Sequence, residues 1–480
     1  MNYKMILSTI GKMFVSLSAL LILPMIVAIV YKETCIAAFL LTAVISFVLG
    51  IILSMVFKTK NHIIYAREGF VIVAAVWLIF SLFGAMPFVL SGEIPNFVDA
   101  FFETVSGFTT TGASILTDVE AMSKSLLFWR SFTHWIGGMG VLVFVLALIP
   151  NISDRSIHLL RAEVPGPVVG KLVPRIRQTA RILYIIYIVL TIIEITFLLL
   201  GKMSLFDSLV HAFGTAGTGG FGIKGDSIGG YSPYLQWVIA IFMLVFGVNF
   251  NIYYLILIKK AKHIIKSEEL WIYVGLIVLS TGFIAVNVFS QYGNFGETLR
   301  HSLFQVSSII TTTGYSTADF NLWPTFSKAV LFLLMFIGGC AGSTAGGLKV
   351  SRVILLFKKI SREIRHTLHP RSVNSIKLEG KQVSENTISS VGTYFAVYSF
   401  ILIGTFLIIS LDSFGFETNF SATVACFNNV GPGFASVGPI ASYAEYSALS
   451  KIVLSFAMLF GRLEIYPLLI FFMPKLWRRD

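Results

Sequence analysis

One short pattern occurs four times along the chain and constrains its fold more than any other feature. The residues Thr-Thr-Thr-Gly at 109–112 recur almost unchanged at 311–314. Two weaker copies, at 216–221 and 429–434, keep the small, glycine-centred pattern. Because the copies lie at intervals of roughly a hundred residues, they predict a fourfold internal repeat.

The composition places this repeat in a membrane. Of the 480 residues, 56% are hydrophobic and 12% are charged, which is outside the range of soluble proteins. A membrane-spanning helix needs about 20 apolar residues. Ten runs of about that length occur, near 12–31, 36–57, 70–91, 126–149, 182–201, 234–258, 271–290, 328–357, 391–411 and 450–473.

The spacing of these runs predicts an all-α polytopic membrane protein. The first two runs are joined by a short link that contains Lys32, Glu33 and Thr34, and they form a hairpin. The other eight form four pairs, and each pair encloses a segment that is too short or too polar to span and that ends in one glycine motif. The predicted organisation is an N-terminal transmembrane hairpin at 1–65, then four helix–pore-loop–helix units around one pore, at 66–160, 161–265, 266–385 and 386–480.

The charged residues predict the orientation of the chain. The net charge of +12 comes from Lys and Arg in the short loops after every second run, which is typical of cytoplasmic loops rather than of nucleic-acid binding. Acidic residues collect on the opposite side. Both termini are therefore expected in the cytoplasm, and all four glycine segments are expected to start from the outer face.

Each glycine segment is predicted to be a re-entrant pore loop. The short helices before the motifs, near 99–108, 207–214, 299–309 and 419–428, rise ~1.5 Å per residue and reach about half of a ~30 Å hydrocarbon core. Non-helical backbone at that depth must be buried in protein or line water. Four such loops on one axis present carbonyl oxygens that replace the hydration shell of a monovalent cation, while the negative ends of the short helices face it.

Several longer motifs resemble the TrkH/KtrB family of potassium transport proteins. They lie at 129–140, 165–167, 171–177, 338–350 and 461–465. The resemblance runs nearly end to end, and the extra N-terminal hairpin is similar to the TrkH branch. It implies potassium uptake in a bacterial inner membrane by a homodimer among membrane lipids. It also implies gating by cytosolic, TrkA-like nucleotide-binding regulatory subunits. Potassium is the transported ion, and no cofactor or nucleic acid is expected.

The family pattern also implies which residues form the filter. It gives Gly112, Gly219, Gly314 and Gly431 as filter glycines, and glycine rather than serine at the first position favours potassium. The fourth motif lacks threonine, and the choice between Gly431 and Gly433 stays open. The predicted ion-binding residues are Thr110, Thr111, Gly112, Thr218, Gly219, Thr312, Thr313, Gly314, Asn429, Val430 and Gly431.

A glycine-rich stretch in the eighth run predicts a gate. Five glycines lie between 338 and 347, so the helix is expected to unwind there, just below the filter. Arg462 lies within the last run and is expected to project into the pore as an electrostatic barrier; a salt bridge to another helix is the alternative. The predicted gate residues are Gly338, Gly339, Gly342, Ser343, Thr344, Gly346, Gly347 and Arg462.

Other functions remain to be distinguished. A secondary symporter of potassium with protons or sodium, or a sodium-permeable transporter of the same fold, is the alternative, although symporter repeats usually have inverted topology. No paired carboxylates or metal-ligand spacings indicate an enzyme. Arg130, His134, Glu194 and His211 are expected to have structural contacts rather than transport roles.

Overall fold

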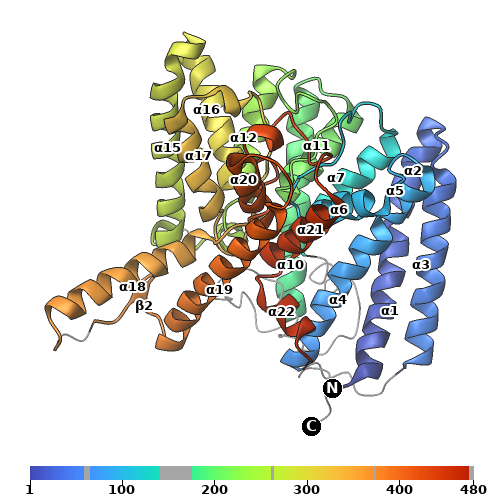
Figure 1. Ribbon diagram of the computed structural model, residues 1–480, viewed down its shortest axis with the longest axis horizontal. Coiled ribbons are helices and arrows are strands. Elements are labelled where there is room, and N and C mark those ends of the chain that lie inside the picture. The colour runs from blue at the N-terminus through green and yellow to red at the C-terminus, as the bar shows by residue number, and fades with distance from the viewer. Residues whose placement is uncertain (59–64, 141–175, 261–263, 372–373, 475–480) are drawn as a thin grey trace.

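The structure is a computed structural model. In the residues that it describes, the secondary structure is helical apart from one small β-hairpin (Figure 1). The structure describes residues 1–58, 65–140, 176–260, 264–371 and 374–474. Its only strands within these ranges are β1 (Lys377–Leu378) and β2 (Lys381–Gln382). The predicted all-α class is confirmed. Outside the described residues lie the motif at 165–167, most of that at 171–177, the unit boundary at 160/161 and the C-terminal cations after 474.

The N-terminal hairpin is present. It consists of α1 (Tyr3–Leu20), α2 (Ile22–Tyr31) and α3 (Ile36–Val56), so its first span begins earlier than the apolar run indicated. The helices α1 and α3 approach closely at Gly11 and Gly50, where a Cβ on either glycine would lie 2.8 Å from the carbonyl oxygen of the other. Small residues at such a contact are typical of membrane helix pairs.

The same order of elements recurs four times after the hairpin. A long helix is followed by a short buried helix, a loop and a second helix. In the first unit the long segment is split into two adjoining helices. In every unit the second helix ends at a non-helical stretch. The four sets are α4 (Ala66–Gly84), α5 (Met86–Ser91), α6 (Phe97–Phe108) and α7 (Lys124–Gly138); α10 (Ile176–Leu200), α11 (Leu205–Gly217), α12 (Pro233–Phe246) and α13 (Phe250–Leu257); α15 (Glu268–Tyr292), α16 (Phe295–Ile310), α17 (Thr325–Ile337) and α18 (Val350–Leu368); and α19 (Glu385–Ile409), α20 (Phe416–Phe427), α21 (Ala448–Arg462) and α22 (Tyr466–Phe472).

The short helices α6, α11, α16 and α20 are the predicted pore helices, and all four lie in the upper half of Figure 1. Each carries an acidic residue in its first turn, and three begin at an Asn or Ser whose side chain accepts a backbone hydrogen bond. These caps and charges favour the N-terminal ends. The C-terminal ends, which carry the negative end of the helix dipole, then lead directly into the glycine motifs.

The second helices differ from the prediction. Six helices in the described part of the chain are long and apolar enough to cross a membrane, or seven if α12 and α13, which are bent by 89°, form one span. The runs predicted near 126–149, 234–258, 328–357 and 450–473 are instead interrupted, because α7, α12, α17 and α21 all end within or beside a glycine-containing stretch. The sequence indicated such a break only in the third unit.

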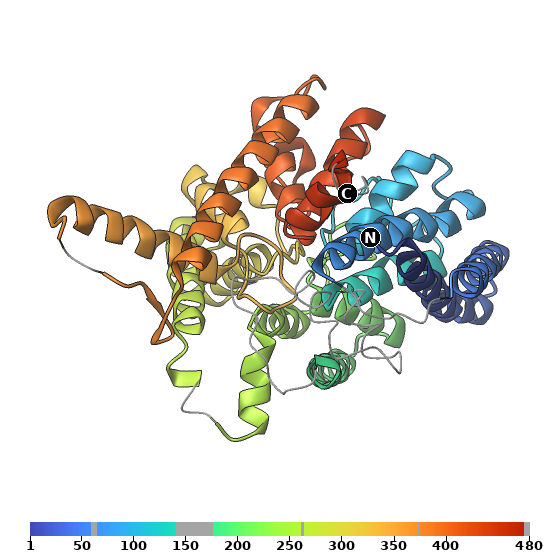
Figure 2. The same cartoon turned by 90° about the horizontal axis from the view of Figure 1, so that it is seen from below.

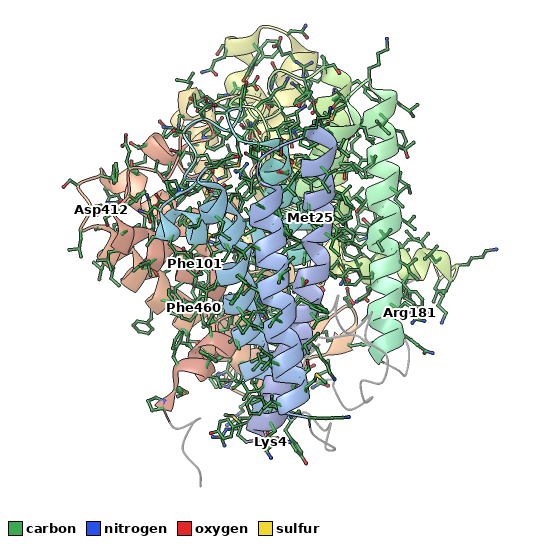
Figure 3. The ribbon with its side chains drawn as sticks, turned by 90° about the vertical axis from the view of Figure 1, so that its right-hand side faces the viewer. Lys4, Met25, Phe101, Arg181, Asp412 and Phe460 are labelled. Atoms are coloured by element: carbon green, nitrogen blue, oxygen red, sulfur yellow. The ribbon has the colours of Figure 1, made fainter. Side chains whose placement is uncertain are left out.

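The helix α18 does not continue the span begun by α17. Figures 1 and 2 show it leaving the body of the molecule sideways, from a point near the lower end of α15. Figure 3 shows Lys4 and Arg181 toward the lower end and Asp412 nearer the opposite end. This separation of basic from acidic side chains along the bundle fits the predicted orientation.

Candidate functional site

The four glycine motifs share one backbone conformation. One residue just beyond the end of each pore helix has φ of 56°; these residues are Thr110, Thr218, Thr312 and Asn429. This is the left-handed region, which residues other than glycine seldom adopt. Two residues later each segment has a glycine with positive φ: 80° at Gly112, 76° at Gly220, 86° at Gly314 and 95° at Gly431.

These segments form a closed ring. A Cβ on Gly112 would lie 2.0 Å from the carbonyl oxygen of Gly219, and one on Gly220 would lie 1.9 Å from that of Thr313. In the same way Gly314 abuts the carbonyl oxygen of Val430 at 2.4 Å, and Gly431 abuts that of Thr111 at 2.5 Å. Each unit therefore touches the next in the order 1, 2, 3, 4 and back to 1, so the segments surround one axis.

The backbone register corrects one predicted position. The amide of Thr111 bonds to the carbonyl five residues earlier, Ser106, and Gly219 makes the equivalent bond to Gly214. Gly219 therefore takes the place of Thr111, and Gly220 rather than Gly219 matches Gly112. The two adjacent glycines made the sequence alignment ambiguous. In the fourth unit the register selects Gly431, which had been open against Gly433.

The four register glycines open onto one external cavity of about 370 Å³. Gly112, Gly220, Gly314 and Gly431 all line it, together with Arg130. A ring of close-packed carbonyls below a vestibule that can hold several water molecules is the arrangement by which a pore exchanges the hydration water of a cation for protein oxygen.

The side chains of the ring are not fourfold. Thr109 Oγ1 and Thr111 Oγ1 lie 2.8 Å apart, as do the equivalent atoms of Thr311 and Thr313. In the fourth unit, Asn429 instead donates from Nδ2 to Thr111 Oγ1 over 2.9 Å. The amide of Asn429 thus makes the side-chain contact in the fourth unit, whose motif lacks threonine. This agrees with the expectation that the four units of the filter differ in chemistry.

A buried ion pair, which the sequence analysis did not assign to the site, supports the first two filter segments. Arg130 of α7 and Glu103 of α6 are 3% and 1% exposed, and Arg130 Nε lies 2.7 Å from Glu103 Oε1. Glu103 also accepts from the backbone N–H of Ile115, while Arg130 donates to the carbonyl of Gly222. Glu103 lies on the pore helix α6, seven residues before Thr110.

We expect Glu103→Gln to lower the melting temperature and the ion flux together. Removing one member of a buried pair leaves the other charge uncompensated, which costs about 3–5 kcal/mol. Glu417→Gln is the matched control, since this pore-helix carboxylate is 59% exposed and lies 3.6 Å from Lys328; such pairs contribute about 0–1 kcal/mol. Thermal unfolding of both variants in detergent checks the prediction, and equal melting temperatures would contradict it.

The other intramembrane polar residues have varied surroundings. His134 is buried behind the filter, where Nδ1 lies 2.7 Å from the carbonyl oxygen of Gly107 and Nε2 accepts from the N–H of Phe221. It therefore links the first pore helix to the second filter segment. His211 Nδ1 lies 2.8 Å from the carbonyl oxygen of Asp207, a local packing role. Glu194 is fully buried, and neither carboxylate oxygen has a hydrogen-bond partner in the described part of the chain.

A non-helical loop lies at the inner end of the ring. The chain unwinds between α17 and α18, at 338–349, as the glycines predicted. The N–H of Gly346 donates to Thr312 Oγ1 over 2.6 Å, and the N–H of Gly347 donates to the carbonyl of Asn428 over 3.1 Å. On the other side, the N–H of Cys340 donates to the carbonyl of Gly247 over 3.0 Å. The loop thus extends from the third unit to the second and fourth.

Arg462 lies at the same inner end of the ring. Its guanidinium donates to the carbonyl of Thr344 in the loop over 2.8 Å and to that of Gly138 at the end of α7 over 2.6 Å. Arg462 of the fourth unit therefore joins the loop of the third unit to the second helix of the first. Glu464, two residues after Arg462, accepts from Arg352 of α18 over 3.0 Å.

The comparisons with known proteins agree with this arrangement. The sequence matches the TrkH family of cation transport proteins over residues 36–286 and 271–479. It is 36% identical over 487 residues to the Trk system potassium uptake protein TrkH of Salmonella typhimurium and 35% identical to that of Escherichia coli K12, with 100% of both chains covered in each case. The fold matches the crystal structure of the potassium transporter TrkH from Vibrio parahaemolyticus with a TM-score of 0.90 and 31% identity, over 100% of both chains.

Proposed function

The chain belongs to the TrkH family of cation transport proteins, and we propose that it takes up potassium through the ring formed by its four glycine segments. Potassium uptake is the function that the family and its full-length relatives support. The observation that carries the proposed pathway is the closed ring of backbone contacts below the external cavity. The chain is a multi-pass membrane protein, and its family is one of transporters rather than enzymes.

Backbone and hydroxyl oxygens of the filter would bind the dehydrated ion. Carbonyl groups select potassium by replacing its hydration shell, and the ring segments are held by pore helices whose negative ends point inward. The proposed ion-binding set keeps the predicted residues and adds the glycine that the register identifies: Thr110, Thr111, Gly112, Thr218, Gly219, Gly220, Thr312, Thr313, Gly314, Asn429, Val430 and Gly431.

The loop at 338–349 is the proposed gate. It bonds to three units directly below the filter, and Arg462 places a positive charge against it. A cation that leaves the filter toward the cytoplasm would meet both. In this conformation the loop and Arg462 would close the inner route, and conduction would require the loop to move.

The proposed partners follow from family resemblance. We propose a homodimer in a bacterial inner membrane, with both termini in the cytoplasm and with cytosolic TrkA-like nucleotide-binding subunits that act on the gate. The location of Lys4 and Arg181 toward one end of the bundle supports this orientation (Figure 3).

Ion flux into liposomes tests the proposed function. We expect the purified full-length chain to admit potassium and rubidium, and to admit sodium at least about tenfold more slowly than potassium. A tenfold ratio of the two rates corresponds to a free-energy difference of about 1.4 kcal/mol. Protein-free liposomes give the background, and a TrkA-like subunit from the same organism is added in a second series. Potassium flux at background in both series, or equal flux of potassium and sodium, would overturn the proposal.

A further inference from the structure

A single buried carboxylate contacts both ends of the gate loop. Glu269 lies in the first turn of α15 and is 6% exposed. Its Oε1 accepts from the N–H of Ala341 over 2.7 Å and from the N–H of Ser351 over 3.1 Å. Ala341 is near the start of the loop, and Ser351 is in the first turn of α18, directly after its end. One oxygen atom therefore fixes the distance between the two arms of the loop.

The chemistry of this contact suits a positioning role. The N–H groups in the first turn of a helix have no partner within the helix, and the helix dipole favours a negative charge beside them. Hydrogen bonds from N–H to a carboxylate are shorter and stronger than neutral ones. The close approach of the loop to this carboxylate is therefore set by charge as well as by geometry.

Neighbouring contacts anchor α18 in the same position. Arg352 pairs with Glu464, which follows α21, and Lys358 lies 2.6 Å from Glu268, the residue before Glu269. The start of α15 thus contacts the gate loop through one carboxylate and the projecting helix through the other. Movement of α18 changes the surroundings of Glu269 first.

We propose that Glu269 is a positioning residue that holds the gate loop closed beneath the filter. This inference rests on the proposed function, because the loop is a gate only if the ring conducts. Glu269 does not contact the ion; it acts through the backbone of the loop. Loss of its acceptor oxygen releases both arms, so the loop leaves the inner end of the filter more often.

The natural cysteine of the loop reports its position independently of transport. Cys340 is fully buried and sits next to Ala341, so it reacts with a membrane-impermeant maleimide only when the loop moves. Glu269→Met keeps the length of the side chain but removes the acceptor. Glu269→Gln keeps an acceptor oxygen that can serve both N–H groups. Glu363→Gln is the control, since that carboxylate is 61% exposed on α18.

We expect Cys340 in the Glu269→Met protein to react with the maleimide about tenfold faster than in the unmodified chain. In the Glu269→Gln protein, the rate should lie within about threefold of that of the unmodified chain. Peptide mass spectrometry on the full-length chain in nanodiscs measures these rates. Potassium flux without a regulatory subunit should rise in the same order. Equal rates for Glu269→Met and Glu269→Gln, with both proteins folded, would overturn the inference. If no variant conducts but Cys340 follows this order, the proposed function fails and the positioning role stands.

Discussion

Gly112→Ser is expected to reduce potassium flux about tenfold or more and to lower discrimination against sodium. The substitution adds a Cβ at a site where it would lie 2.0 Å from the carbonyl oxygen of Gly219, far inside van der Waals contact. The first and second filter segments must separate to admit it. A wider ring no longer matches the ionic radius at which carbonyls replace water around potassium. Paired potassium and sodium flux in liposomes measures both effects.

Gly92→Ser is the matched control for this prediction. Gly92 also has φ of 80°, but a Cβ there would have nothing within 4 Å. The two variants therefore share the backbone strain of a side chain at positive φ, about 1–2 kcal/mol, and differ in the collision. We expect Gly92→Ser to lower the melting temperature slightly and to conduct with normal selectivity. Unchanged selectivity in Gly112→Ser would show that this glycine is not part of the filter.

Much of the fold could be predicted because membrane helices leave a strong signal. Runs of apolar residues located the hairpin and the first helix of every unit, and the short segment before each glycine motif located the pore helices. The second helices were harder. Gly461 allows α21 to approach the end of the fourth pore helix, where a Cβ would lie 2.0 Å from the carbonyl oxygen of Phe427. Apolar composition continues through such a break, so hydropathy does not record it.

The candidate site shows a different limit. The repeated threonine–glycine pattern identified the ring. The backbone conformation then determined the alignment of the second motif, which the sequence left ambiguous. At residues 218–220, Thr-Gly-Gly allows two alignments with Thr-Thr-Gly, and the backbone distinguishes them through the positive φ of Thr218 and Gly220 and the hydrogen bond from Gly219 to Gly214. The backbone dihedral angles decide which residue of the second motif matches Gly112. Glycine can adopt the dihedral angles of either alignment at little steric cost.

The supporting carboxylates were missed because their partners are distant in sequence. Glu103 pairs with Arg130, and Glu269 bonds to Ala341, 72 residues away. The sequence analysis assigned neither carboxylate a supporting role. A charged side chain so close to an apolar run is costly unless it is paired. The sequence therefore did contain a signal, because every acidic residue near a membrane span could have been expected to have a partner.

Arg462→Ala is expected to raise potassium flux about tenfold in the absence of a regulatory subunit. The substitution removes a positive charge beside the gate loop and also the bonds that join this loop, at Thr344, to the first unit, at Gly138. Loss of about 1.4 kcal/mol from the barrier is enough for this increase. Single-channel or liposome flux at low internal sodium measures it, and unchanged flux in a folded protein would refute the barrier.

Arg462→Lys separates the charge from the bridge. Lysine keeps the positive charge, but its compact ammonium lacks the planar fork with which the guanidinium contacts carbonyls in two units at once. If the charge dominates the barrier, Arg462→Lys should conduct like the unmodified chain, whereas Arg462→Ala conducts faster. If the bridge dominates, both variants should conduct faster to the same extent. Because Arg462 and Glu269 hold the loop from opposite sides, Arg462→Lys combined with Glu269→Met should in that second case exceed either change alone, since each removes a separate restraint on the same segment.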